Sequence, residues 1–271
     1  MTEQATNPVR TTEKSLRILD ALRDMGTARV TDLADRLDIP KSTVHNHLST
    51  LREHQYLTKQ GDHYSLSLKY LDLGTYVQVR ERLFRVAAAE IEETSHEHMV
   101  GLFTRENAEA VVLYKTPVRT WDEVPHVGDR FHLHQVPAGL AMLAHVSPEL
   151  REPLFSHTEP EHESSLNERL AEISDRGFAS GTVGGSSISS LAVPVFDQEG
   201  TCLGAVSYLK RDDQREGWNL SQSESLTELT TRIERRMGDE WNPAESFTTL
   251  KHSWTQYADW NDPSDDPEST G

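Results

Sequence analysis

The chain has 271 residues, 35% of them hydrophobic, and a formal net charge of −17. This length suits one small domain and a second of about 150 to 180 residues, so we expect two domains. No apolar run approaches the roughly 18 residues of a membrane span and the N-terminus is polar, which predicts a cytoplasmic protein. The single cysteine, Cys202, excludes an internal disulfide and a multi-cysteine zinc site.

The charge is distributed unevenly along the chain. Residues 1–70 hold 10 Lys and Arg against 9 Asp and Glu, whereas residues 71–271 hold 17 against 35. Because an acidic body repels DNA, we expect the near-neutral N-terminal part to contact a duplex. Arg outnumbers Lys 20 to 7, and a carboxylate-rich, Lys-poor surface is typical of proteins that work in molar salt. The composition predicts a halophilic source, with an ordinary acidic protein as the alternative.

The first predicted element is an amphipathic helix near the N-terminus. Its apolar positions recur at helical spacing, and a glycine follows them, as is common at the C-terminus of a helix. The positions are Leu16, Ile18, Leu19, Leu22 and Met25, and the glycine is Gly26. We expect this helix to complete a three-helix bundle.

Two further short helical patterns meet at a tight break. The first starts after Thr31, a good N-cap, and places its apolar residues on one face. These residues are Leu33, Ala34 and Leu37. Proline disfavours helical geometry in the preceding residue and is itself pre-set for a first helical turn. We therefore expect Ile39 to close one helix and Pro40 to open the next, which is typical of a helix-turn-helix.

The second of these patterns buries Val44, Leu48 and Leu51 and has a polar outer face. A major groove admits one helix and is read by donors and acceptors near that helix's N-terminus, and Asn suits a bidentate contact with adenine. A lysine at the start of the helix is placed to contact a phosphate. The residues expected to bind DNA are Lys41, Ser42, Thr43, His45, Asn46, Ser49, Thr50 and Lys59.

A short hairpin is predicted next, because residues 56–59 and 63–66 alternate like strands around the turn Gln60-Gly61-Asp62. Together with the three helices it forms a winged helix-turn-helix. A protein-binding or purely structural three-helix unit is the alternative. Residues 67–99 then form a mostly helical linker, with Gly74 as its only break, although an ordinary core helix would give nearly the same pattern.

The remainder of the chain alternates between short strands and helices. A Ser/Gly-rich loop is expected from Ser180 to Ser190. Strands are expected at 100–104, 110–115, 191–196 and 202–209, and helices at 137–145, 165–176 and 221–237. This order predicts an α+β domain in which helices cover one sheet. The acidic C-terminal segment is expected to be disordered.

Several separated motifs carry a family resemblance. They are Ser15-Leu16-Arg17-Ile18-Leu19, Leu33-Ala34-Asp35-Arg36-Leu37, Pro40-Lys41-Ser42-Thr43-Val44-His45, Tyr64-Ser65-Leu66, Leu133-His134, residues 137–144, Arg176-Gly177-Phe178-Ala179 and residues 192–197. In this order and spacing the chain resembles the IclR-type transcriptional regulators, over roughly residues 10–240. That resemblance implies a winged helix-turn-helix DNA-binding domain at 10–70, a linker helix and a GAF-like effector-binding domain within 71–245, and a tail at 246–271.

The resemblance also implies partners and a ligand site. Family members are dimers or tetramers that bind a small metabolite, often an organic acid, an aromatic compound or a sugar-derived one. Where the family often has Arg and Leu after the histidine of the recognition helix, this chain has Asn46 and His47, so a phosphate-binding cation is lost. Ser190 stands where many members have a cysteine. The residues carried over as the effector site are His134, Ala138, Gly139, Ser190 and Ser207.

These features predict a sequence-specific transcriptional regulator without a cofactor, which binds an inverted-repeat operator, is modulated by a metabolite and controls catabolic genes. A non-specific architectural DNA-binding protein is the main alternative. A metal-responsive regulator is another, because His126, His132 and His134 cluster and alternation would put the last two on one face of a strand. No hydrolase or nucleotide-binding motif is present, so we expect no enzyme, with an esterase using Ser187 as the weak alternative.

Overall fold

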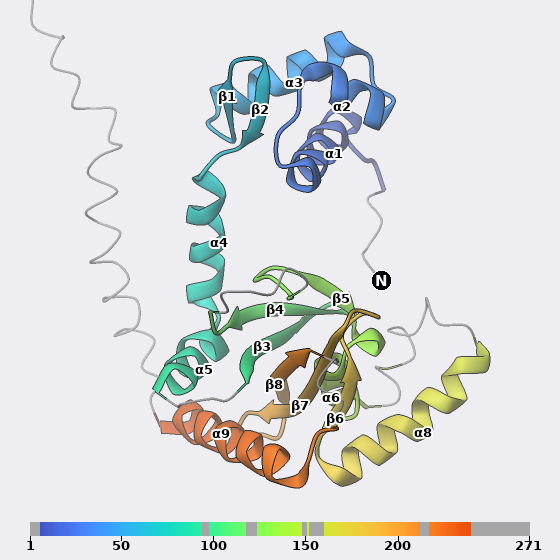
Figure 1. Ribbon diagram of the computed structural model, residues 1–271, viewed down its shortest axis with the longest axis vertical. Helices are drawn as coiled ribbons and strands as arrows, with labels where there is room; N and C mark the ends of the chain where they lie inside the picture. The colour runs from blue at the N-terminus through green and yellow to red at the C-terminus, as the bar shows by residue number, and fades with distance from the viewer. Residues whose placement is uncertain are drawn as a thin grey trace, which may run out of the picture.

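The computed structural model describes residues 6–93, 98–117, 124–147, 151, 160–211 and 217–239. Within them the chain forms two domains at opposite ends of one helix, α4 (Lys69–Arg80), which Figure 1 shows as a rod between them. No helix among these residues has the length and apolar character that crossing a membrane requires. The acidic C-terminal segment lies outside the described residues.

The N-terminal domain is a winged helix-turn-helix, as predicted. Its helices are α1 (Arg10–Met25), α2 (Val30–Leu37) and α3 (Lys41–Glu53), and its wing is β1 (Leu57–Gln60) paired antiparallel with β2 (His63–Leu66). The three helices share one apolar core, in which Ile18, Leu22, Leu33, Val44 and Leu48 are fully buried. Burial of these side chains fixes which faces of the helices remain outside.

The helix boundaries differ from the prediction by one or two residues. Arg29, not Thr31, caps α2, because its backbone N–H donates to the Asp32 carboxylate while its guanidinium pairs with the same group. After α2, Asp38 adopts the left-handed conformation, with φ 53°, and Ile39 is buried in the core. Pro40 is the N-cap of α3, not its first helical residue.

The linker breaks at Glu81, so the prediction of a break at Gly74 was wrong. Gly74 lies inside α4, whereas Glu81 has an extended ψ of 114° and separates α4 from α5 (Arg82–Glu93). The carbonyl groups freed at the end of α4 accept hydrogen bonds from Arg85 Nη1, at 2.7 Å for Val79 and 3.1 Å for Arg80. This side-chain cap satisfies the backbone where the helix stops.

The second domain is built on one antiparallel sheet with the strand order β5-β4-β3-β8-β7-β6. Its strands are β3 (Met99–Glu106), β4 (Glu109–Lys115), β5 (Arg130–His132), β6 (Ala179–Thr182), β7 (Ile188–Phe196) and β8 (Cys202–Arg211). The segment from Ser180 to Ser190 was expected to be one Ser/Gly-rich loop, but its first residues belong to β6 and its last residues to β7. Only residues 183–187 of that segment lie outside the strands.

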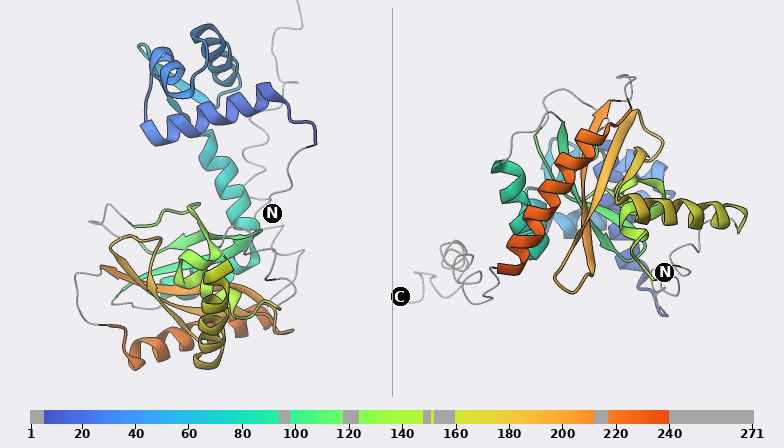
Figure 2. Two further views of the ribbon diagram at one scale, coloured as in Figure 1. Left: turned by 90° about the vertical axis from the view of Figure 1, so that its right-hand side faces the viewer. Right: turned by 90° about the horizontal axis from the view of Figure 1, so that it is seen from below.

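Helices cover both faces of this sheet, which confirms the α+β class. One face packs against α6 (Pro137–Leu143) and α8 (Pro160–Arg176), and the other against α5 and α9 (Leu220–Asp239), as Figure 2 shows from two directions. Alternate residues of each central strand therefore enter two separate apolar clusters. In β8, Ala205 and Leu209 face the α6 side, while Val206 and Tyr208 face the α9 side.

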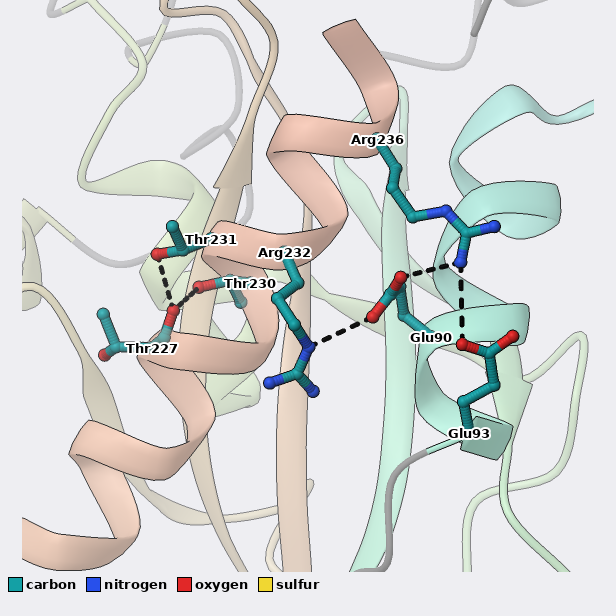
Figure 3. A network of polar contacts seen from close by, with 7 residues as sticks. All are labelled: Glu90, Glu93, Thr227, Thr230, Thr231, Arg232 and Arg236. Atoms are coloured by element: carbon teal, nitrogen blue, oxygen red, sulfur yellow. Dashed lines mark hydrogen bonds and ion pairs between the residues drawn. The ribbon is translucent and has the colours of Figure 1, made fainter. Parts of the chain in front are cut away.

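A buried carboxylate joins the linker to the second domain. Glu90 of α5 accepts hydrogen bonds from Arg236 Nη1 at 2.7 Å and from Arg232 Nε at 3.1 Å, both on α9 (Figure 3). Arg82 at the start of α5 also donates to the carbonyl of Met237. The hydrogen bonds from the two guanidinium groups hold the pKa of Glu90 below its usual value. The polar contacts therefore clamp α5 against α9 beside their shared apolar contact.

Replacing Glu90 with Gln should lower the free energy of unfolding by about 1–2 kcal/mol near neutral pH. We place the loss low in the range for charge-assisted bonds because Arg232 and Arg236 are 38% and 37% exposed. Since folding lowers the pKa of Glu90, its contribution is present above the pKa of the unfolded carboxyl and is lost as the pH falls through the folded value. Urea titrations of both proteins across the acidic range measure this.

Glu93→Gln is the matched control, because Glu93 lies on the same helix and pairs with the same Arg236, but at 3.8 Å and with 71% of its side chain exposed. It should change stability by less than about 0.5 kcal/mol. Equal losses from the two substitutions would contradict the assignment of the clamp to Glu90.

Candidate nucleic-acid interface and ligand site

Helix α3 presents a polar outer face at the end of the molecule distant from the sheet domain (Figure 1). Of the eight residues expected to bind DNA, six are exposed and two are half-buried. The exposed ones are Lys41, Ser42, His45, Asn46, Thr50 and Lys59, and the half-buried ones are Thr43 and Ser49. Val44 and Leu48 face inward with no exposed surface, so the polar positions between them point away from the core.

Two side chains of α3 are engaged within the domain. His47 turns toward α1, where its Nδ1 lies 2.8 Å from the hydroxyl of Ser15. Burial, with a smaller effect of Lys14, lowers the pKa of His47 and so favours the neutral ring. At the other end of the outer face, Thr50 Oγ1 donates to the Asn46 carbonyl at 3.1 Å, which leaves only its acceptor capacity for a partner.

His47 therefore fills a structural position in the place where the family often carries leucine. The departure at Asn46 is different, because that side chain is exposed on the outer face. An amide there can donate and accept hydrogen bonds, whereas the arginine usual in the family would offer only donors and a charge. Between Lys41 and Thr50, the exposed residues of α3 thus carry a single formal charge, at Lys41 next to the N-terminus, while Arg52 and Glu53 are exposed in the last turn of the helix.

The wing is fastened to the helices by backbone bonds that the sequence analysis missed. Ala28, between α1 and α2, donates to the Tyr64 carbonyl at 3.0 Å, and Tyr64 donates back to the Ala28 carbonyl at 2.8 Å. Lys59 pairs with Tyr64 across the hairpin, and its side chain is exposed with Nζ 5.1 Å from the centroid of the Tyr64 ring. The hairpin is thus held beside α3 with its lysine exposed.

In the second domain, two of the predicted effector residues lie on neighbouring strands. Ser190 of β7 and Ser207 of β8 are both buried, and alternation places both on the side of the sheet that α6 covers. Across the sheet Ser207 pairs with Ala192 on β7 and Gly101 on β3, which are small residues. Neither paired residue has a polar side-chain atom that could bond to the Ser207 hydroxyl.

The hydroxyl of Ser207 is buried and has no hydrogen-bond partner among the described residues. Burying a hydroxyl without a partner is unfavourable, and such groups in native proteins usually bind a water or a ligand. Ser190 has only 1% of its surface exposed, so a larger side chain there would overpack the core. Ser207 is therefore the more informative of the two positions.

The other three predicted effector residues lie where the chain enters α6. His134 is half-buried in a short 3-10 turn, Leu133–Gln135, while Ala138 and Gly139 are buried in the first turns of α6. A Cβ on Gly139 would overlap the backbone of Leu133. Its lack of a side chain thus lets the turn pack closely on the helix, and Ala138 joins the apolar cluster on the α6 side of the sheet.

The Ser/Gly loop is an ordered turn that folds over the same region. The N–H of Gly184 donates to the Gln135 carbonyl at 3.2 Å, and a Cβ on Gly184 would lie 3.4 Å from the Phe131 ring. Within the loop, Ser186 N–H donates to the Val183 carbonyl at 2.8 Å. The contacts of Gly184 with Gln135 and Phe131 were not predicted, because they join residues about fifty positions apart in the sequence.

His132 and His134 lie side by side as expected, but not on one strand. Strand β5 ends at His132 and His134 lies in the following 3-10 turn, where the two rings stack with centroids 5.8 Å apart and planes 5° from parallel. His126 lies near Asp129, with its Nδ1 3.7 Å from the carboxylate. Over the described ranges no three His, Cys, Asp or Glu side chains form a group that could hold a metal ion.

Comparison with protein families matches most of the chain. A model of the IclR helix-turn-helix domain matches residues 11–61, and a model of the bacterial transcriptional regulator IclR C-terminal domain matches residues 77–217. Among curated relatives, the probable HTH-type transcriptional regulator ArcR of Halobacterium salinarum is 28% identical over 61% of this chain and 68% of its own. The HTH-type transcriptional regulator KdgR of Dickeya chrysanthemi is 26% identical over 72% of this chain and 68% of its own.

Solved structures show the same fold. An IclR homolog from Microbacterium hydrocarbonoxydans, complexed with 4-hydroxybenzoate, superimposes with a TM-score of 0.71 at 21% identity, over 85% of this chain and 100% of that one. The IclR of Thermotoga maritima gives 0.66 at 20% identity, over 84% of this chain and 98% of that one. At these identities the likeness establishes the architecture alone.

Proposed function

Because the chain belongs to the IclR family of transcriptional regulators, which are not enzymes, we propose that it binds an inverted-repeat operator as a symmetric homo-oligomer and responds to a small metabolite. Its target genes would be catabolic. The observation that carries this proposal is the exposed, nearly uncharged polar face of α3 beside a fastened wing. Such a face suits contacts with base edges better than general attraction to phosphates.

The test of this function is genome-wide crosslinking of the native protein in its own host. A few sharp peaks over a shared inverted repeat would support a specific regulator, and the neighbouring genes would indicate the pathway. Broad coverage without a motif would instead favour the architectural alternative, whose affinity falls steeply with salt.

The acidic composition supports an extension of this proposal to molar salt. The Debye length at about 1 M salt is roughly 3 Å, so phosphate contacts lose much of their advantage and base contacts must carry more of the affinity. The loss of a cation at Asn46 is consistent with that. A protein that keeps its fold and its preference for one palindrome after dialysis to low salt would contradict halophilic adaptation.

The linker supports the oligomer. Helix α4 has no buried residue, and its apolar side chains are unusually exposed for a soluble protein. They are Leu71, Leu73, Tyr76 and Val77, and Leu68 at the N-cap is exposed as well. We assign their occupant as α4 of a second copy, since a two-fold axis along the linker would place two recognition helices on one side of a duplex, about 34 Å apart or a multiple of it.

Leu71→Lys should weaken self-association about tenfold or more, because a buried charge would replace an apolar contact. Sedimentation velocity over a range of concentrations measures it. Leu71 is 66% exposed within one chain, so the substitution should leave the fold of the monomer intact. Leu220→Lys is the control, because Leu220 is 70% exposed at the start of α9, and a similar loss there would contradict the role of α4.

Base recognition and phosphate contact can be separated by two substitutions. Asn46→Ala should weaken binding to the operator by about 1–3 kcal/mol, or roughly 5- to 150-fold, while sparing non-specific binding. Lys41→Ala should weaken binding to all sequences alike and lower the salt slope by about 1. Fluorescence anisotropy with the operator and with a scrambled duplex measures both.

Asn167→Ala, at an exposed position of α8, is the control and should change neither affinity. Equal losses of Asn46→Ala on operator and scrambled duplexes would contradict a base contact.

The ligand is proposed to bind against the sheet face that carries Ser190 and Ser207, near His134 and the start of α6. The unpartnered hydroxyl of Ser207 supports a ligand with polar oxygens, such as a carboxylate or a polyol. A difference of ~1–3 kcal/mol between its affinities for two dimer geometries would change DNA affinity about 5- to 150-fold.

Ser207→Ala should leave the unliganded protein as stable as before, or up to about 1 kcal/mol more stable, because it removes an unsatisfied polar group. It should also weaken the ligand about fivefold. Thermal unfolding with a panel of carboxylates and polyols, beginning with 4-hydroxybenzoate, measures both effects. Ser223→Ala is the control, because this buried hydroxyl donates to the Leu220 carbonyl at 2.8 Å and its loss should destabilise without changing ligand response.

A further inference from the structure

We infer that the contacts between the end of the recognition helix α3 and the start of the linker α4 act as a positioning device that sets the half-site separation the protein accepts. The residues that carry it are Ser67 and Lys69, which approach the last backbone groups of α3. This inference rests on the proposed operator binding and adds a structural origin for its spacing.

Two side chains of the linker segment bond directly to the end of α3. Lys69 Nζ donates to the carbonyl of His54, the C-cap residue, at 3.0 Å, and Ser67 Oγ donates to the carbonyl of Gln55 at 2.5 Å. Ser67 Oγ also accepts a bond from the backbone N–H of Lys69 at 3.2 Å, which fixes the hydroxyl between both elements. These bonds bypass the wing, although the wing separates α3 from α4 in the sequence.

Aromatic contacts reinforce the same junction. The Lys69 ammonium group lies 4.4 Å from the centroid of the Tyr56 ring, and Tyr56 meets Tyr70 of α4 edge to face with centroids 5.6 Å apart. The N–H of Ser67 donates to the Tyr56 carbonyl at 3.1 Å. Gln55, between His54 and Tyr56, holds the left-handed conformation with φ 62°, which a residue other than glycine keeps only where its surroundings enforce it.

The geometry explains why this junction would determine spacing. Only Ser67 and Leu68 separate the wing strand β2 from α4. Without the side-chain contacts, the winged helix-turn-helix domain, here called the reader domain, could turn relative to α4 about this short connection. A turn of roughly 20° at about 17 Å from a dimer axis would move a recognition helix by about 6 Å, nearly two base pairs. A rigid junction would therefore restrict the dimer to operators whose half-sites have one separation.

The experiment is binding-site selection from random duplexes with the full-length protein and with Ser67→Ala/Lys69→Met, at one salt concentration. The original chain should enrich an inverted repeat at one separation. The variant should enrich the same half-site with separations spread by about two base pairs either way, and its preference for the best spacing should fall from about tenfold to less than threefold. An unchanged single separation would overturn the inference, even if overall affinity fell.

Three further variants keep the result interpretable. Lys69→Arg retains a cation and hydrogen-bond donors, so this variant should still enrich a single half-site separation. If the double variant is unstable, Lys69→Met alone should give part of the broadening. Arg176→Met is the matched control, because Arg176 also stacks on a ring, 4.6 Å from the Phe178 centroid, and donates to a backbone carbonyl, yet lies in the sheet domain. Broadening by Arg176→Met would overturn the inference. A wild-type chain that enriches no inverted repeat would overturn the proposed function itself.

Discussion

Within the described part of one chain, helix α4 has no buried residue, and the contacts at its two ends join it to the winged helix-turn-helix domain and to the sheet domain. At its first end, Ser67 and Lys69 donate to the carbonyl groups of Gln55 and His54, directly after the last residue of α3. At its second end, Gln78 donates to the Leu113 carbonyl of β4 at 2.6 Å, and Arg85 caps the final carbonyl groups. A helix of this length is stiff between its ends, so both terminal contacts act on the same rigid body.

The second end of the linker continues into the sheet domain through α5. The Glu90 clamp fixes α5 to α9, and α9 packs on β7, whose other side carries Ser190. A ligand at the proposed site on the α6 side of the sheet would thus be separated from α4 by one strand layer and two helices, α9 and α5. This contiguous packing supplies a physical route between the proposed ligand site and the winged helix-turn-helix domain.

Much of the fold was predictable because it depends on local patterns. The spacing of Val44 and Leu48 fixed the inner face of α3, and the glycine turn at Gly61 fixed the wing, so the exposed position of Asn46 followed without a structure. The junction was not predictable, since Lys69 and His54 are joined across the wing. The break at Glu81 was equally hidden, because the long-range contact of Gln78 and the cap from Arg85 outweigh the weak helix propensity of Gly74.

The sheet domain divides two tasks between consecutive residues of the same strands. Along β7, Ser190 and Ala192 face α6, while Leu191 and Val193 face α9. Substitutions at the first set would change the proposed ligand site without changing the side chains that support α9. During evolution, the ligand specificity of one face of such a strand can change while the packing of its other face against α9 stays the same. A change of effector and a change of operator geometry then require separate mutations.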